Sequence, residues 1–96
     1  MGPTCEYLCN LLGYDKLLPM NSGAEAGETA VKLARRWGYV KKGIPDNQAK
    51  IVMMEGNFWG RTITASGACD DPSRYDKFGP FTPGFPLVPF DNTDAI

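Results

Sequence analysis

The fold is decided by residues 20–43, which read MNSGAEAGETAVKLARRWGYVKKG. Ser22 and Glu25 have the spacing of a capping box, in which the serine hydroxyl covers an amide one turn into the helix and the carboxylate reaches back. Apolar side chains then recur at helical spacing, at Ala30, Leu33, Ala34 and Trp37. Gly43 can adopt the left-handed conformation that often ends a helix. The pattern predicts a helix over residues 22–42.

Shorter elements are expected on both sides of this helix. Helical spacing of apolar residues predicts a first helix over residues 6–12, and brief apolar runs predict strands over 17–20 and 51–54. Consecutive apolar residues fit a strand covered on both faces, so the order strand, helix, strand favours a parallel β-α-β unit. A short helix over 60–68 and a proline-rich loop with a short strand over 70–90 complete an α/β fold. Residues 1–96 are expected to form one domain or part of one.

The composition argues against several functional classes. Ten Lys+Arg against 11 Asp+Glu give a net charge of −1, without the clustered basic residues typical of a nucleic-acid-binding surface. No apolar run approaches the roughly 18 residues of a membrane-spanning helix. We therefore expect neither nucleic acid nor a membrane as a partner. The odd count of three cysteines indicates free thiols in a reducing, intracellular compartment, and the absence of histidine argues against a metal site.

Two segments follow the predicted strands, at the edge of a parallel sheet where ligands usually bind. Residues 22–24 open the long helix, where unpaired amides and the helix dipole can hold an anion such as phosphate. Phe58 or Trp59 offers a face for stacking on a planar ring, and Arg61 offers a planar fork for a carboxylate or phosphate. Taken singly, each segment has an ordinary interpretation: a capped helix start, and core aromatics beside a surface ion pair.

The motifs NSGAEA at 21–26 and FWGRT at 58–62 resemble the large domain of the class III pyridoxal-phosphate-dependent aminotransferases. More narrowly, three motifs resemble the ornithine aminotransferase branch of that family: YDK at 14–16, RWGY at 36–39 and FGPF at 78–81. Most other branches have histidine where this chain has Trp59. The resemblance implies an incomplete part of the fold type I aminotransferase large domain, in which a mainly parallel sheet is flanked by helices.

The same resemblance implies roles for particular residues. The implied cofactor-binding residues are Ser22, Gly23, Ala24 and Phe58, and the implied substrate-binding residues are Arg61 and Trp59. In family members of this kind, amides at the helix start hold the phosphate of pyridoxal 5'-phosphate and the phenylalanine stacks on its pyridine ring. The arginine binds the substrate α-carboxylate, and the tryptophan would line the pocket.

The resemblance also implies a reaction for the parent enzyme. It would transfer the δ-amino group of L-ornithine to 2-oxoglutarate, giving glutamate 5-semialdehyde and glutamate, as a homodimer or higher oligomer in the mitochondrial matrix or cytosol. The lysine that binds the cofactor covalently would lie beyond residue 96, so no catalytic residue is expected in this chain. The alternatives are a non-catalytic fragment or interaction module, and another ω-aminotransferase of class III.

Overall fold

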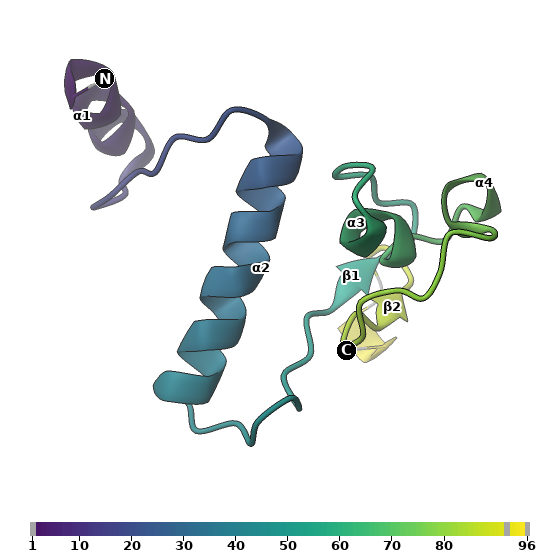
Figure 1. Cartoon of the computed structure of the whole chain (residues 1–96). Helices are drawn as coiled ribbons and strands as arrows, with labels where there is room; N and C mark the ends of the chain where they lie inside the picture. Colours follow the sequence, from purple (N-terminus) through teal and green to yellow (C-terminus); the bar gives the residue numbers. More distant parts are fainter. Residues whose placement is uncertain (1, 92, 96) are drawn as a thin grey trace.

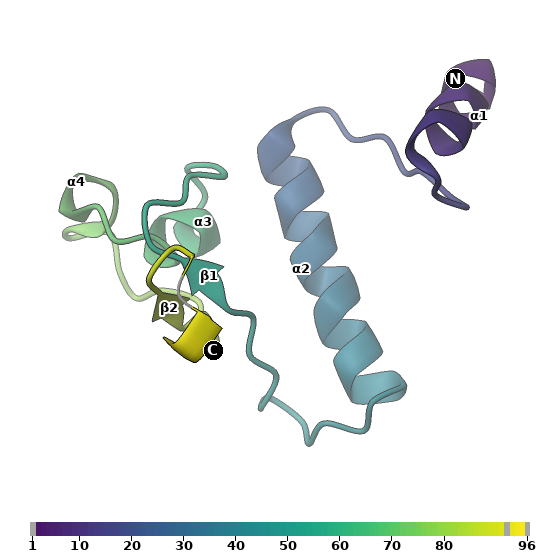
Figure 2. The same cartoon turned by 180° about the vertical axis from the view of Figure 1, so that it is seen from behind.

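The computed structural model describes residues 2–91 and 93–95 (Figure 1). Its regular elements are α1 (Gly2–Leu12), α2 (Gly23–Val40), β1 (Met53–Met54), α3 (Ile63–Gly67), α4 (Pro72–Tyr75), β2 (Leu87–Val88) and a 3-10 helix (Thr93–Ala95). The long helix α2 stands between two parts of the chain. Figures 1 and 2 both show α1 on one side of α2 and the two strands, α3 and α4 on the other.

Helix α2 lies within the range 22–42 that the capping pattern predicts. Its N-cap is Ser22, whose Oγ accepts a hydrogen bond from the amide of Glu25 at 3.2 Å. The Glu25 carboxylate accepts from the side chains of Ser22 and Asn21, at 3.3 and 3.4 Å. Gly43, with a φ of 81°, follows the C-terminal turn. The start of α2 is therefore fixed by its own side chains.

The sheet is formed by β1 and β2, which pair in parallel with Met53 opposite Leu87 and Met54 opposite Val88. Backbone hydrogen bonds extend the ladder on both sides, from Ile51 N to Gly84 O at 2.8 Å and from Glu55 N to Val88 O at 2.7 Å. The chain between the two strands carries α3 and α4. The β-α-β connection therefore crosses over through these short helices and does not use α2.

The predicted strand over 17–20 is not formed. In the described residues this segment has no regular structure and belongs to no sheet, and Leu18 is 71% exposed. A strand needs a partner ladder, and Pro19 has no amide to donate to one. The predicted strand over 51–54 is shortened to Met53–Met54, and its partner is β2.

The other boundaries also differ from the predicted ones. Helix α1 begins at residue 2, ahead of the predicted 6–12, because Pro3 is well tolerated in the first turn of a helix. Helix α3 is shorter than the predicted 60–68, since Thr62 caps it. The range 70–90 contains α4 as well as a strand, because Asp71 caps a helix that begins with Pro72.

The buried apolar side chains come from α2, α3, the turn that follows α3, and β2. They are Val31, Ala65, Ala68, Cys69 and Val88. By contrast, Leu33 and Trp37, on the periodic apolar face of α2, are 69% and 58% exposed. Val31 and Gly38 are the buried residues of α2. No helix in the described part of the chain is long and apolar enough to cross a membrane.

We expect the isolated 96-residue chain to be marginally stable and to self-associate. The apolar face of α2 is left uncovered, and exposed patches of that kind seek partners. Near-UV dichroism, dye binding and sedimentation of the chain expressed alone will test this. A compact monomer with a cooperative thermal transition would contradict the expectation and favour a self-sufficient, non-catalytic module.

Candidate functional site

The first candidate segment is the start of α2. In the described part of the chain, the amides of Gly23 and Ala24 have no hydrogen-bond acceptor, while those of Glu25 and Ala26 are paired with Ser22. A Cβ placed on Gly23 would meet no atom within 4 Å, so a ligand can approach the backbone closely. Free amides at the positive end of an 18-residue helix suit an anion. The geometry therefore fits the predicted phosphate cradle, residues 22–24.

The second candidate segment, residues 58–62, lies directly against this cradle. A Cβ placed on Gly60 would lie 2.8 Å from the Cβ of Ala24, a separation that side chains do not tolerate. Thr62 Oγ1 donates a hydrogen bond to Glu28 Oε1 at 2.8 Å. The fold thus brings the two predicted segments together through a close backbone approach at Gly60.

Phe58 and Arg61 share a cavity of about 490 Å³, which is completed by Gly60, Ile63, Ser66, Ser73, Arg74 and Phe78. Phe58 is 56% exposed, so its ring is not a core residue. Arg61 is exposed and has no hydrogen bond or ion pair within residues 2–91 and 93–95. An open aromatic ring and an unpaired guanidinium at one cavity suit a planar, anionic ligand.

Trp59 points elsewhere. A Cβ placed on Gly27 of α2 would lie 2.5 Å from Trp59 Cε3, so the indole packs against the side of that helix. Trp59 is half-buried and does not line the cavity of Phe58 and Arg61. Its indole Nε1 is buried without a hydrogen-bond partner in the described residues. The structure therefore separates Trp59 from the two site residues on either side of it in the sequence.

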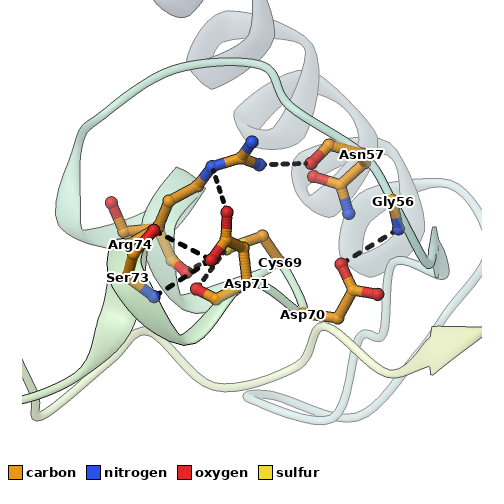
Figure 3. A network of polar contacts seen from close by, with 8 residues as sticks. Gly56, Asn57, Cys69, Asp70, Asp71, Ser73 and Arg74 are labelled. Atoms are coloured by element: carbon orange, nitrogen blue, oxygen red, sulfur yellow. Dashed lines mark hydrogen bonds and ion pairs between the residues drawn. The ribbon is translucent and has the colours of Figure 1, made fainter.

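A polar network holds the backbone that leads into Phe58 (Figure 3). Asn57 Nδ2 donates to the carbonyl oxygens of Met54 and Ala68, both at 2.7 Å. The amide of Gly56 donates to Asp70 Oδ1 at 3.0 Å. Residues 55–57, which follow β1 without forming a helix or strand, are therefore fixed to the turn that follows α3.

The network continues to Arg74, a residue that the sequence analysis did not single out. Arg74 Nη1 donates to the carbonyl of Asn57 at 3.0 Å, and its Nε lies 3.5 Å from Asp71 Oδ2. Its guanidinium carbon lies 4.8 Å from the centroid of the Phe58 ring. The Asp71-Pro72 pair was the available sequence signal, because it marks a helix start that would orient residue 74.

Asp71 anchors this end of the network. One of its carboxylate oxygens accepts from the hydroxyl and the amide of Ser73, at 2.8 and 3.0 Å. These two hydrogen bonds, with a smaller contribution from the positive charge of Arg74, lower the pKa of Asp71 below its usual value. Asp71 therefore stays ionised, and able to pair with Arg74, to more acidic pH than an isolated aspartate.

Among the residues that the structure describes, no group of three or more potential ligand side chains could hold a metal ion.

The model of the family described as aminotransferase class-III matches residues 1–96. The chain therefore belongs to the class III aminotransferase family. The relatives most similar to it include proteins named mitochondrial ornithine aminotransferase, from Drosophila melanogaster at 57% identity and Rattus norvegicus at 55%. Each alignment covers 100% of this chain and 22% of the relative. The chain thus spans about a fifth of the length of these relatives.

Solved structures agree with this assignment. An ornithine aminotransferase from Toxoplasma gondii, described as having partial occupancy of PLP at its active site, matches with a TM-score of 0.95 and 49% identity. That match covers 98% of this chain and 22% of the other. The Plasmodium falciparum ornithine δ-aminotransferase matches with a TM-score of 0.67 and 46% identity, over 98% and 19% of the two chains. As expected from the sequence, the α/β fold is a portion of the fold type I aminotransferase architecture.

Proposed function

We propose that this chain is the phosphate- and ring-binding part of a pyridoxal-phosphate-dependent ornithine aminotransferase. The observation that supports this most is the contact of Gly60 with Ala24, which joins the anion cradle to the segment of Phe58 and Arg61. The names of the relatives add the substrate, L-ornithine, and 2-oxoglutarate is the amino acceptor that such an enzyme would use. The enzyme that contains this segment is called the complete enzyme below.

The residues present fit the cofactor. The amides of Gly23 and Ala24 would donate to its phosphate, since they have no acceptor in the described residues and the space beside Gly23 is open. Ser22 would bound the same cradle, with its hydroxyl held by Glu25. Phe58 would place its exposed ring against the pyridine. When bound, pyridoxal phosphate supplies the electron-withdrawing ring through which amino groups are transferred.

Substrate binding would fall to Arg61. Its planar guanidinium can form two parallel hydrogen bonds with a carboxylate, and none of the described residues competes for it. Fixing the α-carboxylate there would leave the distal amine of ornithine free to reach the cofactor. Trp59 would contribute from the side of α2, outside the cavity that Phe58 and Arg61 share, where its unpaired Nε1 could donate to a group of the bound complex.

The assembly and the compartment follow from the same proposal. We expect a homodimer or a higher homo-oligomer, located in the mitochondrial matrix or the cytosol, since several of the relatives are named mitochondrial. A non-catalytic interaction module is the second candidate, favoured by the exposure of Leu33 and Trp37 on α2.

A chimera tests the proposed function directly. In the Drosophila melanogaster relative, the residues that match would be replaced by this chain, which is 57% identical over its whole length. We expect the chimera to bind pyridoxal phosphate and to transfer an amino group from ornithine to 2-oxoglutarate. A folded chimera that binds no cofactor would refute the assignment of the cradle. One that binds the cofactor and prefers another ω-amino acid would correct the substrate.

The isolated chain, in contrast, should form no specific covalent bond with pyridoxal phosphate. Lysines that react with this cofactor are usually activated by burial, and all six lysine side chains here are exposed. Mixing the chain with pyridoxal phosphate, reducing with borohydride and mapping the adducts by mass spectrometry should show scattered, low labelling. A single stoichiometric lysine adduct would contradict the expectation that the covalent lysine lies elsewhere.

A further inference from the structure

Arg74 contacts both the ring of Phe58 and the backbone directly before it. Its guanidinium carbon lies 4.8 Å from the ring centroid, and its Nη1 donates to the Asn57 carbonyl at 3.0 Å. A guanidinium at that distance is attracted to the face of an aromatic ring. Arg74 therefore adds a hydrogen bond to the backbone before Phe58 and covers one face of its ring.

The guanidinium of Arg74 is also held by Asp71, in addition to its contacts with Phe58 and Asn57. Its Nε lies 3.5 Å from Asp71 Oδ2, while the other carboxylate oxygen of Asp71 is occupied by Ser73 (Figure 3). Asp71 is also the N-cap of α4, so its position is tied to that helix. The guanidinium is thus held between an anchored carboxylate and the Asn57 carbonyl.

Packing alone does not hold the Phe58 ring. The side chain is 56% exposed, in a loop without regular structure, whereas the backbone around Asn57 is fixed by hydrogen bonds to Met54 and Ala68. Because the arginine covers one face of the ring, a planar ligand can stack only on the opposite face. The contact with Arg74 therefore restrains the orientation of a ring whose backbone is already placed.

We propose that Arg74 is a positioning residue for the cofactor, which holds Phe58 so that its uncovered face meets the pyridine ring. This inference rests on the proposed function, because it requires pyridoxal phosphate to stack on Phe58. Arg74 lines the same cavity as Arg61, so the competing role is direct binding of a substrate carboxylate. The two roles predict different readouts.

The first experiment replaces Arg74 by glutamine in the complete enzyme. The dissociation constant of pyridoxal phosphate, measured by titrating the apoenzyme, should rise by about two- to fivefold, the size of a surface cation–π contact. The visible circular dichroism of the bound cofactor should also change, because it reports the orientation of the ring. Arg74→Lys should restore part of the cofactor affinity and part of the dichroism, because it keeps the positive charge. The restoration should be incomplete, because lysine lacks the planar fork. Arg36→Gln, at an exposed arginine of α2, is the matched control and should change neither.

The second experiment repeats Arg74→Gln in a Phe58→Leu background. Phe58→Leu alone should weaken cofactor binding, and the added Arg74→Gln should then have no further effect, because its target ring is absent. An undiminished effect in that background would overturn the positioning role. So would a raised KM for 2-oxoglutarate with unchanged cofactor affinity and dichroism, which would make Arg74 a substrate ligand. Unchanged cofactor affinity in Phe58→Leu alone would instead refute the stacking role in the proposed function.

Discussion

Replacing Arg61 by lysine in the complete enzyme should lower kcat/KM for ornithine by about 30- to 150-fold, equivalent to roughly 2–3 kcal/mol. The lysine keeps the positive charge and loses the planar fork that pairs with both oxygens of a carboxylate. Arg61 is exposed and unpaired in the described residues, so the substitution removes no internal contact that they show. The loss should therefore fall on substrate binding and leave the stability of the apoenzyme unchanged.

Steady-state kinetics and the cofactor absorbance spectrum together check this result. Arg36→Lys provides the same chemical change at an exposed position of α2 and should leave kcat/KM unaltered. Unchanged kinetics in Arg61→Lys would mean that Arg61 is a solvent-exposed residue with no part in substrate binding. Loss of the cofactor signal would move Arg61 from the substrate carboxylate to the cofactor.

Local signals in the sequence are enough to predict the long helix, and they single out residues 22–24 and 58–62 as candidate segments. The capping box at Ser22 fixes the start of α2 through contacts within four residues, and such contacts can be inferred from spacing alone. The sequence also predicts that the cradle lies beside residues 58–62, on the ground that both follow strands of one sheet. No strand is formed over 17–20, and the two segments instead meet where Gly60 of the loop contacts Ala24 of α2.

The pairing of strands far apart in the chain could not be predicted from the sequence. The strand Met53–Met54 pairs with Leu87–Val88, more than 30 residues away, and a two-residue strand leaves almost no periodic pattern. The contact of Arg74 with Phe58 was missed for a similar reason. It depends on α4, a single helical turn in a stretch where prolines favoured a loop.

The face of α2 that packs is defined by small side chains. The residue that meets the indole of Trp59 is Gly27, and a Cβ on Gly38 would lie 3.1 Å from Ile44. Val31 lies on the same face and is buried. Hydrophobic periodicity gives weight to large residues and so identified the exposed face of Leu33 and Trp37. The close approach of backbone and ring on the packed face requires glycine.

Gly60→Ala should cause the largest loss of stability and of cofactor binding among single substitutions in the site. The new methyl group would lie 2.8 Å from the Cβ of Ala24, and Gly60 has a φ of 154°, which side-chain-bearing residues rarely adopt. Overpacking together with backbone strain should cost about 2–4 kcal/mol. Because Ala24 belongs to a rigid helix, the loop must move, and Phe58 and Arg61 would move away from the cradle with it.

Urea unfolding of the apoenzyme and its titration with pyridoxal phosphate measure the two effects, with Gly2→Ala, which has no neighbour within 4 Å, as a control. The decisive variant is Gly60→Ala combined with Ala24→Gly. Removing the Ala24 methyl leaves contacts of 3.5 Å to its Cα and 3.6 Å to the Cβ of Ala65, both ordinary. The loss caused by Gly60→Ala should therefore shrink in that background to the part due to backbone strain. An equal loss of stability and cofactor affinity in both backgrounds would mean that the contact between Gly60 and Ala24 does not join the cradle to residues 58–62.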